Sequence, residues 1–328
     1  MKVLVTGATG FVGATLVLRL VESQRVDVSA AVRRHSIQWL GAVDQVIAGD
    51  LTPNTNWQPL VQDVNVLVHL AARVHVMCDT VVAPLVEFRR VNVEGTLNLA
   101  RQAAVAGVRR FVYLSSIKVN GEFTRLGQTF TADDIPAPQD PYSISKYEAE
   151  EGLRQLARET GLEVVIIRSP LVYGPGVKAN FLSMMRWLWR GIPLPLGAIH
   201  NKRSLVALDN LVDLIVTCLD HPAAANQTFL VSDSEDLSTT ELLRRMGDAL
   251  GKPARLISVP VSWLQVATML GSSDMAQRLC GSLQVDIAKT RELLGWTPPV
   301  RVEEGLRSAA DDFLRGLLRP TVRNDEVV

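Results

Sequence analysis

The sequence predicts an α/β fold, in which a Rossmann-type, doubly wound parallel sheet is joined to a smaller C-terminal domain. Two observations lead to this prediction. Short runs rich in Val, Ile and Leu alternate with longer stretches of helical period from the first residue onward, as expected for parallel strands covered on both faces. After residue 170 this alternation ends, and loop-forming Gly and Pro punctuate the chain.

The predicted strands and helices follow one another in βαβ order, which implies a parallel sheet. Apolar runs predict strands at residues 2–6, 27–32, 45–48, 64–70, 111–114 and 163–167. Helical period predicts helices at residues 12–22, 93–106 and 141–160. We expect a dinucleotide-binding domain over residues 1–170, a mainly substrate-binding domain over 171–318, a strand at 228–231 that returns to the first sheet, and a frayed tail at 319–328.

The composition excludes several classes of protein. Of the 328 residues, 47 % are apolar and 21 % charged, so the bulk of the chain is not disordered. The 34 basic and 34 acidic residues cancel, which argues against non-specific binding to nucleic acid or to an anionic membrane surface. Three scattered cysteines, without CxxC pairs, argue against a disulfide framework or a zinc site. With no signal peptide or membrane-spanning run, we expect a cytoplasmic protein.

The loop after the first strand is typical of dinucleotide binding. Gly7, Gly10 and Gly13 form a GxxGxxG pattern between the strand and an amphipathic helix. Glycine there allows a tight turn and a close approach of the backbone to a pyrophosphate, and the helix N-terminus offers amides and partial positive charge. A glycine trio is a weak signal by itself, but its position favours this function over a plain turn. The expected contacts are Gly7, Thr9, Gly10, Phe11, Val12 and Gly13.

The end of the second strand favours NADP(H) over NAD(H). An acidic residue there would bind the ribose 2′-hydroxyl of NAD, but this chain has Arg33 and Arg34. Two guanidiniums suit a 2′-phosphate, although a solvated arginine pair is the simpler alternative, and NAD(H) stays possible. Asp50 and Leu51 follow the third strand and are candidates for holding the adenine; Asp50 is equally suited to capping a turn.

A tyrosine and a lysine near the start of helix 141–160 form a candidate acid/base pair. Asp140, Pro141 and Gly161 mark the ends of this helix. Tyr142 and Lys146 are four residues apart, so their side chains share a face. A nearby ammonium stabilises a phenolate and makes tyrosine a usable general acid or base. The YxxxK pattern alone is weak, because it arises by chance on many helices.

Several other candidate residues follow strands and therefore meet at one edge of the sheet. In an open α/β sheet, ligands bind beyond the carboxyl ends of the strands. Ser115 and Ser116 end the fifth predicted strand, although a serine that merely ends a strand is common. On this interpretation one edge carries Gly7, Asp50, Ala71, Ala72, Ser116 and Arg168.

Taken together, these motifs resemble the extended short-chain dehydrogenase/reductase family, and within it the nucleotide-sugar epimerase, dehydratase and reductase branch. The resemblance covers nearly the whole chain. It rests on the glycine loop, His69-Leu70-Ala71-Ala72, Asn92, Ser115-Ser116, Tyr142-xxx-Lys146, Val172-Tyr173-Gly174 and Leu294-Gly295-Trp296-Thr297-Pro298.

The resemblance implies roles for individual residues. Tyr142 would be the general acid/base, Lys146 its pKa partner and a ligand of the cofactor ribose, Ser116 the hydrogen-bond partner of the reacting oxygen, and Asn92 a brace. Further cofactor contacts would come from Leu70, Ala71, Ala72, Ser115, Arg168 and Pro170. Candidate contacts with a UDP-sugar substrate are Arg73, His75, Ser116, Lys118, Asn180, Arg203 and Arg278. Asn180 is equally suited to capping a helix, and Arg203 to an exposed charge pair.

Two segments depart from the usual epimerase pattern. Ser-Ile-Lys-Val-Asn-Gly-Glu at residues 116–122 and Arg-Val-His at 73–75 resemble bacterial O-antigen enzymes that reduce UDP-4-keto-6-deoxy-N-acetylhexosamines. Dehydratases of this branch carry an Asp-Glu pair where this chain has Ile117 and Lys118, which disfavours dehydration.

The leading hypothesis is therefore an NADPH-dependent 4-ketoreductase in surface polysaccharide synthesis. The same catalytic residues suit a UDP-hexose or UDP-N-acetylhexosamine 4-epimerase with bound NAD, and a non-catalytic NADP-binding regulator is a third alternative. The family also implies a homodimer built on helices 93–106 and 141–160. The leucines of these helices, Leu97, Leu99, Leu153 and Leu156, would line that interface or pack on the sheet.

Overall fold

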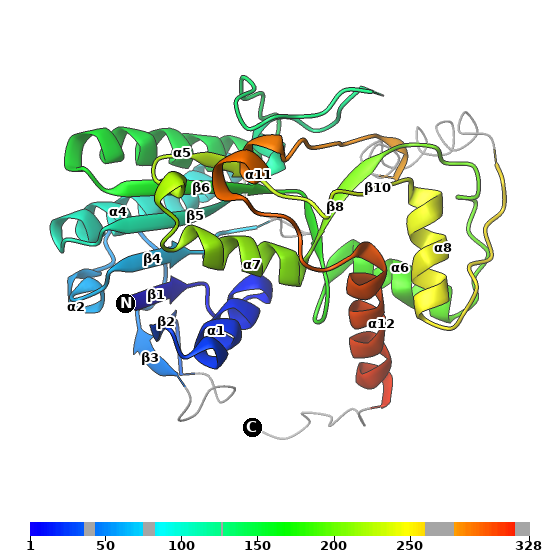
Figure 1. Cartoon of the computed structure of the whole chain (residues 1–328), viewed down its shortest axis with the longest axis horizontal. Helices are drawn as coiled ribbons and strands as arrows, with labels where there is room; N and C mark the ends of the chain where they lie inside the picture. Colours follow the sequence, from blue (N-terminus) through cyan, green and yellow to red (C-terminus); the bar gives the residue numbers. More distant parts are fainter. Residues whose placement is uncertain (36–42, 75–82, 126, 260–278, 319–328) are drawn as a thin grey trace.

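The central element of the computed structural model is a seven-stranded parallel sheet (Figure 1). The structure describes residues 1–35, 43–74, 83–125, 127–259 and 279–318. The strands run across the sheet in the order β3 (Asp44–Ile47), β2 (Asp27–Val32), β1 (Lys2–Thr6), β4 (Val66–His69), β5 (Arg110–Ser116), β6 (Glu163–Ser169) and β9 (Thr228–Leu230). The strand order reverses between β1 and β4, which creates the crevice where ligands bind in such sheets. The predicted fold class is confirmed.

Apolar side chains alternate between the two faces of this sheet, so helices cover both. On β1, Val3 and Val5 belong to one core cluster, and Leu4 belongs to another. The first face is covered by α1 (Phe11–Ser23), α7 (Leu208–Cys218) and α11 (Ala288–Leu294). The second is covered by α2 (Gln58–Val61), α4 (Thr96–Val105) and α5 (Pro141–Thr160). Leu99, Leu153 and Leu156 are buried in this second cluster, so they pack on the sheet.

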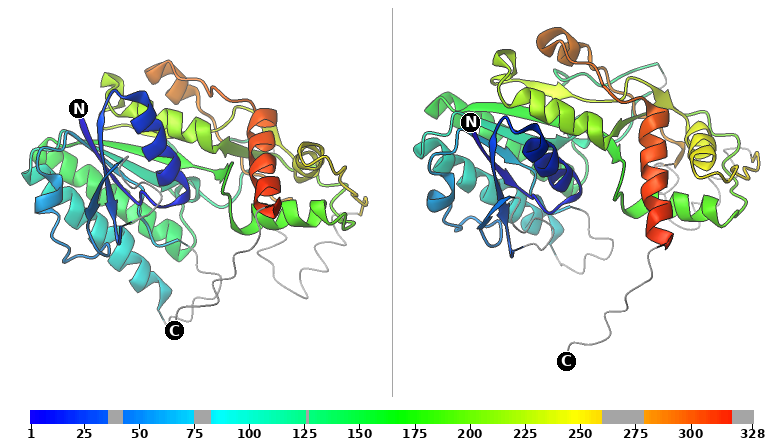
Figure 2. Two further views of the ribbon diagram at one scale, coloured as in Figure 1. Left: turned by 90° about the horizontal axis from the view of Figure 1, so that it is seen from below. Right: turned by 60° about the horizontal axis from the view of Figure 1, so that its bottom comes forward.

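A second group of elements lies beside the strand ends. Its three-stranded sheet has the order β10 (Asp236–Leu237), β8 (Arg203–Ala207) and β7 (Leu171–Tyr173). It packs with α6 (Ala179–Trp189), α8 (Thr239–Ala249) and α12 (Val302–Leu318), which stand together in both views of Figure 2. The Tyr173 hydroxyl donates to Asp233 Oδ2 at 2.8 Å inside this group. The strand expected at residues 228–231 is present as β9 and returns to the first sheet, so the second group of elements is not one continuous stretch of chain. The domain boundary expected at residue 170 stays a prediction.

The predicted elements match the observed ones closely, with one informative exception. Where the sequence predicts a single helix at 93–106, helical structure begins much earlier, with α3 (Pro84–Phe88) and a π-helical segment, η2 (Arg89–Gly95), ahead of α4. None of these three begins with a side-chain cap, and Pro84 at the first helical position of α3 is the local signal that the sequence prediction does not use. Two short 3₁₀ helices, η3 (Ile117–Val119) and η4 (Pro222–Ala224), lie between the longer elements. Within the described residues, no helix is long and apolar enough to cross a membrane.

Candidate active site

The glycine loop between β1 and α1 passes very close to its neighbours. Gly7 has φ +68°, and a Cβ added there would lie 2.6 Å from the Ala71 backbone nitrogen beyond β4. A Cβ at Gly13 would overlap the carbonyl oxygen of Gly7. Both positions therefore exclude larger residues, because a side chain would push α1 away from the sheet.

The N-terminus of α1 fits a bound pyrophosphate. Its N-cap is Gly10, which has no side chain to cap the first-turn amides, and the first turn carries no acidic residue. The amides and the positive end of the helix dipole therefore point toward the strand ends without a competing anion from the helix itself. The remaining expected cofactor residues lie on or next to this edge: Thr9, Phe11, Val12, Leu51, Leu70, Ala72 and Pro170.

Beyond β2 the structure presents two exposed arginines. Arg33 Nη1 lies 3.8 Å from Asp50 Oδ1, and both side chains are largely exposed. Arg34 is also exposed. No Asp or Glu occurs in the sequence between residues 28 and 43, so β2 ends without the carboxylate that would bind a ribose 2′-hydroxyl.

Asn92 braces the site from the π-helical segment, a kind of distortion found often at functional sites. It is buried, accepts a hydrogen bond from the Arg73 backbone N–H at 2.7 Å, and donates to the Arg73 carbonyl oxygen at 3.0 Å. Its amide also donates to Ser145 Oγ at 3.0 Å, and that hydroxyl donates to the Tyr142 carbonyl oxygen at 2.7 Å. Asn92 thus ties the segment after β4 to the first turn of α5.

A capping box fixes the start of α5. Asp140 Oδ1 accepts from the Ser143 backbone N–H at 2.6 Å, and Ser143 Oγ accepts from the Asp140 N–H at 3.1 Å. Pro141 occupies the first helical position, and Gly161 ends the helix in the left-handed conformation. The predicted helix therefore begins at the residue needed to place Tyr142 and Lys146 on its inner face.

Lys146 is held at the centre of the site. Its ammonium donates to the Leu114 carbonyl oxygen at 2.7 Å and lies 4.3 Å from the centre of the Tyr113 ring. Burial lowers the pKa of Lys146 to about 7, and the charge of Glu150 one helical turn further on opposes that shift. A negative charge that develops nearby therefore favours the protonated lysine.

Tyr142 lies one turn before Lys146, close to the end of β5. Its ring meets Phe88 edge to face, with the centroids 6.1 Å apart. Burial and the charge of Asp140 raise the pKa of the Tyr142 phenol, so the hydroxyl is protonated in the free protein. Ser116, the last residue of β5, accepts a hydrogen bond from the Lys118 N–H at 3.3 Å. The arrangement is suited to giving a proton to a substrate oxygen.

A buried ion pair behind these residues was not foreseen from the sequence. Glu150 is fully buried and accepts from Arg168 through both oxygens, at 3.0 and 2.6 Å, and from Ser115 Oγ at 2.6 Å. Arg168 also donates to Asn120 Oδ1 at 2.9 Å. The side chains of Arg168 and Ser115 are thus engaged inside the protein, and their expected contacts with a cofactor stay predictions. The available signal was the spacing of Glu150, four residues after Lys146.

His69 is a second unforeseen support. It is buried, and its ring nitrogens lie 2.7 Å from Thr6 Oγ1 and 2.9 Å from Thr96 Oγ1. Burial, and then the charge of Lys146, lower the pKa of His69 to about 3, so the ring is neutral at ordinary pH. It therefore links β1, β4 and α4 without adding a charge beside Lys146.

Lys118, expected to contact substrate, is occupied by carboxylates of the protein. Its ammonium lies 2.6 Å from Asp140 Oδ2 and 3.0 Å from Glu122 Oε1. Lys118 therefore joins the segment after Ser116 to the start of α5.

The structure describes two of the four remaining substrate candidates, and their role stays a prediction. Asn180 is exposed near the start of α6. Arg203 begins β8 and donates to the Gly281 carbonyl oxygen at 3.1 Å. His75 and Arg278 lie outside the described residues. The described residues also contain no group of His, Cys, Asp or Glu side chains able to hold a metal ion.

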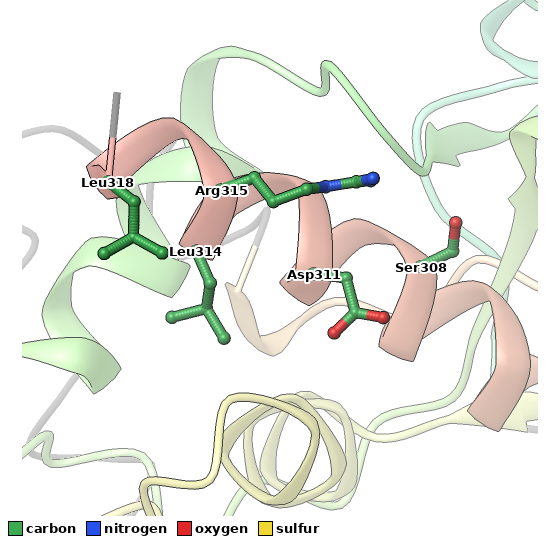
Figure 3. A pocket seen from close by; sticks show the side chains of 5 residues that line it. All are labelled: Ser308, Asp311, Leu314, Arg315 and Leu318. Carbon is green, nitrogen blue, oxygen red and sulfur yellow. The ribbon is translucent and has the colours of Figure 1, made fainter. Parts of the chain in front are cut away.

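Two surface hollows lie away from these residues. One, of about 350 Å³, follows a single side of α12 and is lined by Ser308, Asp311, Leu314, Arg315 and Leu318 (Figure 3). The other, of about 270 Å³, includes Arg154, Arg158 and Thr228 beside β9. Neither contains Ser116, Tyr142 or Lys146.

The fold and this site define a dinucleotide-dependent enzyme of the short-chain dehydrogenase/reductase type. The sequence profile of the NAD dependent epimerase/dehydratase family matches residues 3–232, and the chain belongs to that family. It is 50 % identical over 316 residues to a UDP-glucose 4-epimerase of Vibrio cholerae, covering 96 % of both chains. It is 29 % identical to a UDP-glucose 4-epimerase of Mycolicibacterium smegmatis, over 95 % of this chain and 98 % of that one.

Solved structures of related proteins have the same fold. MoeE5 in complex with UDP-glucose and NAD has a TM-score of 0.74 at 26 % identity, covering 97 % of this chain and 100 % of MoeE5. The UDP-glucuronic acid 4-epimerase from Bacillus cereus, in complex with NAD, has a TM-score of 0.77 at 21 % identity, with 97 % and 100 % covered. The expected family and fold are thus confirmed.

Proposed function

We propose that this protein reduces the C4 keto group of a UDP-4-keto-6-deoxy-N-acetylhexosamine with NADPH, giving UDP-N-acetylquinovosamine or UDP-N-acetylfucosamine for a bacterial surface polysaccharide. The reduction needs a proton donor at the C4 oxygen, and the geometry of Ser116, Tyr142 and Lys146 supports that role. A nicotinamide cofactor supplies the hydride when bound. The observation that carries the reductive direction is the Arg33–Arg34 pair after β2, because net reduction in cells usually draws on NADPH.

In this mechanism the Tyr142 hydroxyl gives its proton to the C4 oxygen while the carbon accepts a hydride. Ser116 Oγ shares the hydrogen bond to that oxygen and fixes the orientation of the sugar. The phenolate left on Tyr142 is stabilised by the ammonium of Lys146, whose protonation the developing charge favours. A solvent proton then restores the phenol, which completes the balance of one hydride and one proton added.

A UDP-hexose 4-epimerase is the second candidate, and the 50 % identical relative from Vibrio cholerae favours it. An epimerase would use the same residues in both directions. Tyr142 would first remove the proton of the C4 hydroxyl as C4 gives up its hydride. After the keto sugar has rotated and C4 has taken the hydride back on its other face, Tyr142 would return the proton to the C4 oxygen. The catalytic residues therefore do not separate the two candidates, but net consumption of cofactor does.

The test adds purified protein and NADPH to UDP-4-keto-6-deoxy-N-acetylglucosamine and follows nicotinamide absorbance. We expect stoichiometric loss of NADPH and a 6-deoxy product whose C4 configuration NMR defines. If NADPH is stable while UDP-glucose and UDP-galactose, or their N-acetyl forms, interconvert without added cofactor, the epimerase is correct. Binding of cofactor without binding of any nucleotide sugar would contradict both candidates and favour a regulator.

The same proposal includes a cytoplasmic homodimer. Three of the four leucines considered for the subunit interface are buried against the sheet, so a dimer would use other positions of α4 and α5. Light scattering of the purified chain measures this directly: a mass near twice 35.9 kDa is expected.

A further inference from the structure

The ion pair between Lys118 and Asp140 connects the two segments that carry the proposed catalytic groups. Lys118 comes two residues after Ser116, and Asp140 two residues before Tyr142. Their charged atoms are 2.6 Å apart, and the two side chains are only 25 % and 20 % exposed. Glu122 binds the same ammonium at 3.0 Å. A pair this close and this sheltered is screened by solvent much less than a surface pair.

The negative charge of Asp140 is not required for capping the helix. Its Oδ1 atom caps α5 through the Ser143 N–H, a task that asparagine or serine performs about as well. The carboxylate does affect its neighbour, because its charge disfavours a phenolate on Tyr142. The hydrogen bond and the positive charge of Lys118, together with the bonds from Ser143, outweigh burial and lower the pKa of Asp140 to about 2. Asp140 is therefore always ionised at the pH of catalysis.

We propose that Lys118 is a positioning residue that neutralises the Asp140 carboxylate, so that Tyr142 can take on negative charge during the reaction. Lys118 acts through Asp140, without contact with the reacting atoms. This inference rests on the proposed role of Tyr142. It assigns a function to the lysine that stands where dehydratases of this branch carry an acidic residue.

Other charged groups of the described residues lie near Tyr142, but they do not contact Lys118. Their effect on the pKa of Tyr142 should therefore be the same in the wild type and in the Lys118 variants. Lys146, one turn further along α5, faces the Tyr113 ring and is followed by Glu150, which is bound to Arg168. The guanidinium of Arg73 lies 5.6 Å from the Phe88 ring that meets Tyr142. On the exposed side of α5, Glu148 is paired with Arg89. Among the ion pairs of the described residues, replacing Lys118 removes the partner that Asp140 and Glu122 share.

The test compares Lys118→Met, Asp140→Asn, the double variant and Lys118→Arg by pH–rate profiles of the holoenzyme. In Lys118→Met, the part of the pH–rate profile that reports the ionisation of Tyr142 should move up by about one pH unit. The same variant should lower kcat about tenfold and leave KM nearly unchanged. Asp140→Asn keeps the cap and should move the same part of the profile down. The double variant should recover most of the lost kcat, and Lys118→Arg should retain it.

Two other results would overturn the inference. If Lys118 contacts the sugar, Lys118→Met raises KM and Asp140→Asn does not restore activity. If the ion pair only holds the two segments together, both single variants and the double variant lose activity. In that case Lys118→Met and Asp140→Asn do not shift the pH–rate profile in opposite directions. The matched control is Lys289→Met, which breaks a Lys–Asp pair of 2.7 Å with Asp133 at the surface and should leave the profile unchanged.

A second measurement observes Tyr142 without turnover. The chain has four tyrosines, so 3-fluorotyrosine labelling gives few ¹⁹F signals, and Tyr142→Phe identifies the relevant one. Its titration should move up in Lys118→Met and down in Asp140→Asn. If Tyr142→Phe turns over normally, the proposed function of Tyr142 fails, while this titration still decides whether Lys118 controls the phenol. If Tyr142→Phe is inactive and Lys118→Met titrates like the wild type, only the Lys118 inference fails.

Discussion

The catalytic edge of the first sheet and the group of elements around the second sheet are organised in different ways. At the catalytic edge, Asn92, Lys146 and Glu150 are buried and each has a partner on another element. Near the second sheet, the substrate candidate Asn180 is exposed, and Arg203 is bound to a backbone carbonyl. The difference indicates that the residues proposed for the chemistry are fixed by contacts within the protein, whereas Asn180, proposed for sugar recognition, stays exposed to solvent.

The largest effect should come from replacing the proposed acid/base. Tyr142→Phe removes the transferable proton but keeps the ring against Phe88, so we expect kcat to fall about 10³-fold with the Kd of the cofactor unchanged. Steady-state kinetics and cofactor fluorescence measure the two quantities. Tyr147→Phe, on the same helix, is the control and should keep wild-type kcat. Turnover of Tyr142→Phe at the wild-type rate would remove this residue from the mechanism.

The next effect tests whether the buried network prepares the catalytic edge. Glu150→Gln leaves Arg168, which is 1 % exposed, without its counter-ion, and we expect the free energy of unfolding to fall by about 3–5 kcal/mol. Glu151→Gln is the control, because Glu151 is 55 % exposed in its ion pair with Arg154. Loss of that exposed ion pair should change the free energy of unfolding by less than about 1 kcal/mol. Urea denaturation measures both. If the two variants lower the free energy of unfolding equally, the buried ion pair of Glu150 and Arg168 stabilises the protein no more than an exposed one.

A smaller effect concerns cofactor choice. Replacing Arg33 and Arg34 together by serine should weaken NADPH binding about 10- to 30-fold, since charge-assisted hydrogen bonds to a 2′-phosphate are lost. The affinity for NADH serves as the internal control and should change little. Titration calorimetry with both cofactors measures the ratio. If both affinities fall equally, or neither falls, the arginines do not read the 2′-phosphate.

The smallest effect concerns the pH dependence of stability. Because the pKa of His69 is lowered from 6.5 to about 3 by folding, the unfolded chain takes up a proton between these values that the folded protein refuses. The contribution of neutral His69 to the free energy of unfolding is therefore complete near neutral pH and is lost as the pH falls from 6.5 toward 3. His69→Gln should be less stable at neutral pH and should show a shallower loss between pH 7 and pH 4 in urea denaturation. An unchanged slope would mean that His69 does not contribute to acid sensitivity.

The sequence predicts those features whose signals are local. Asp140, Pro141 and Gly161 mark the ends of α5, so the positions of Tyr142 and Lys146 on that helix follow directly. The role of Glu150 depends on Arg168 and Ser115, which belong to other elements, and only the structure brings the three together. Lys118 illustrates the same limit: as a residue type it is suited to a phosphate or a sugar, but the fold places it against Asp140.

The most direct test of the central claim follows the hydride itself. Protein, NADPH deuterated at the transferable position of the nicotinamide and UDP-4-keto-6-deoxy-N-acetylglucosamine are incubated, and the product is examined by NMR. The proposed function predicts one deuterium at C4 of the sugar for each NADPH consumed, and transfer about 10³-fold slower with Tyr142→Phe. A product without deuterium at C4, or stable NADPH in the presence of the keto sugar, would contradict it.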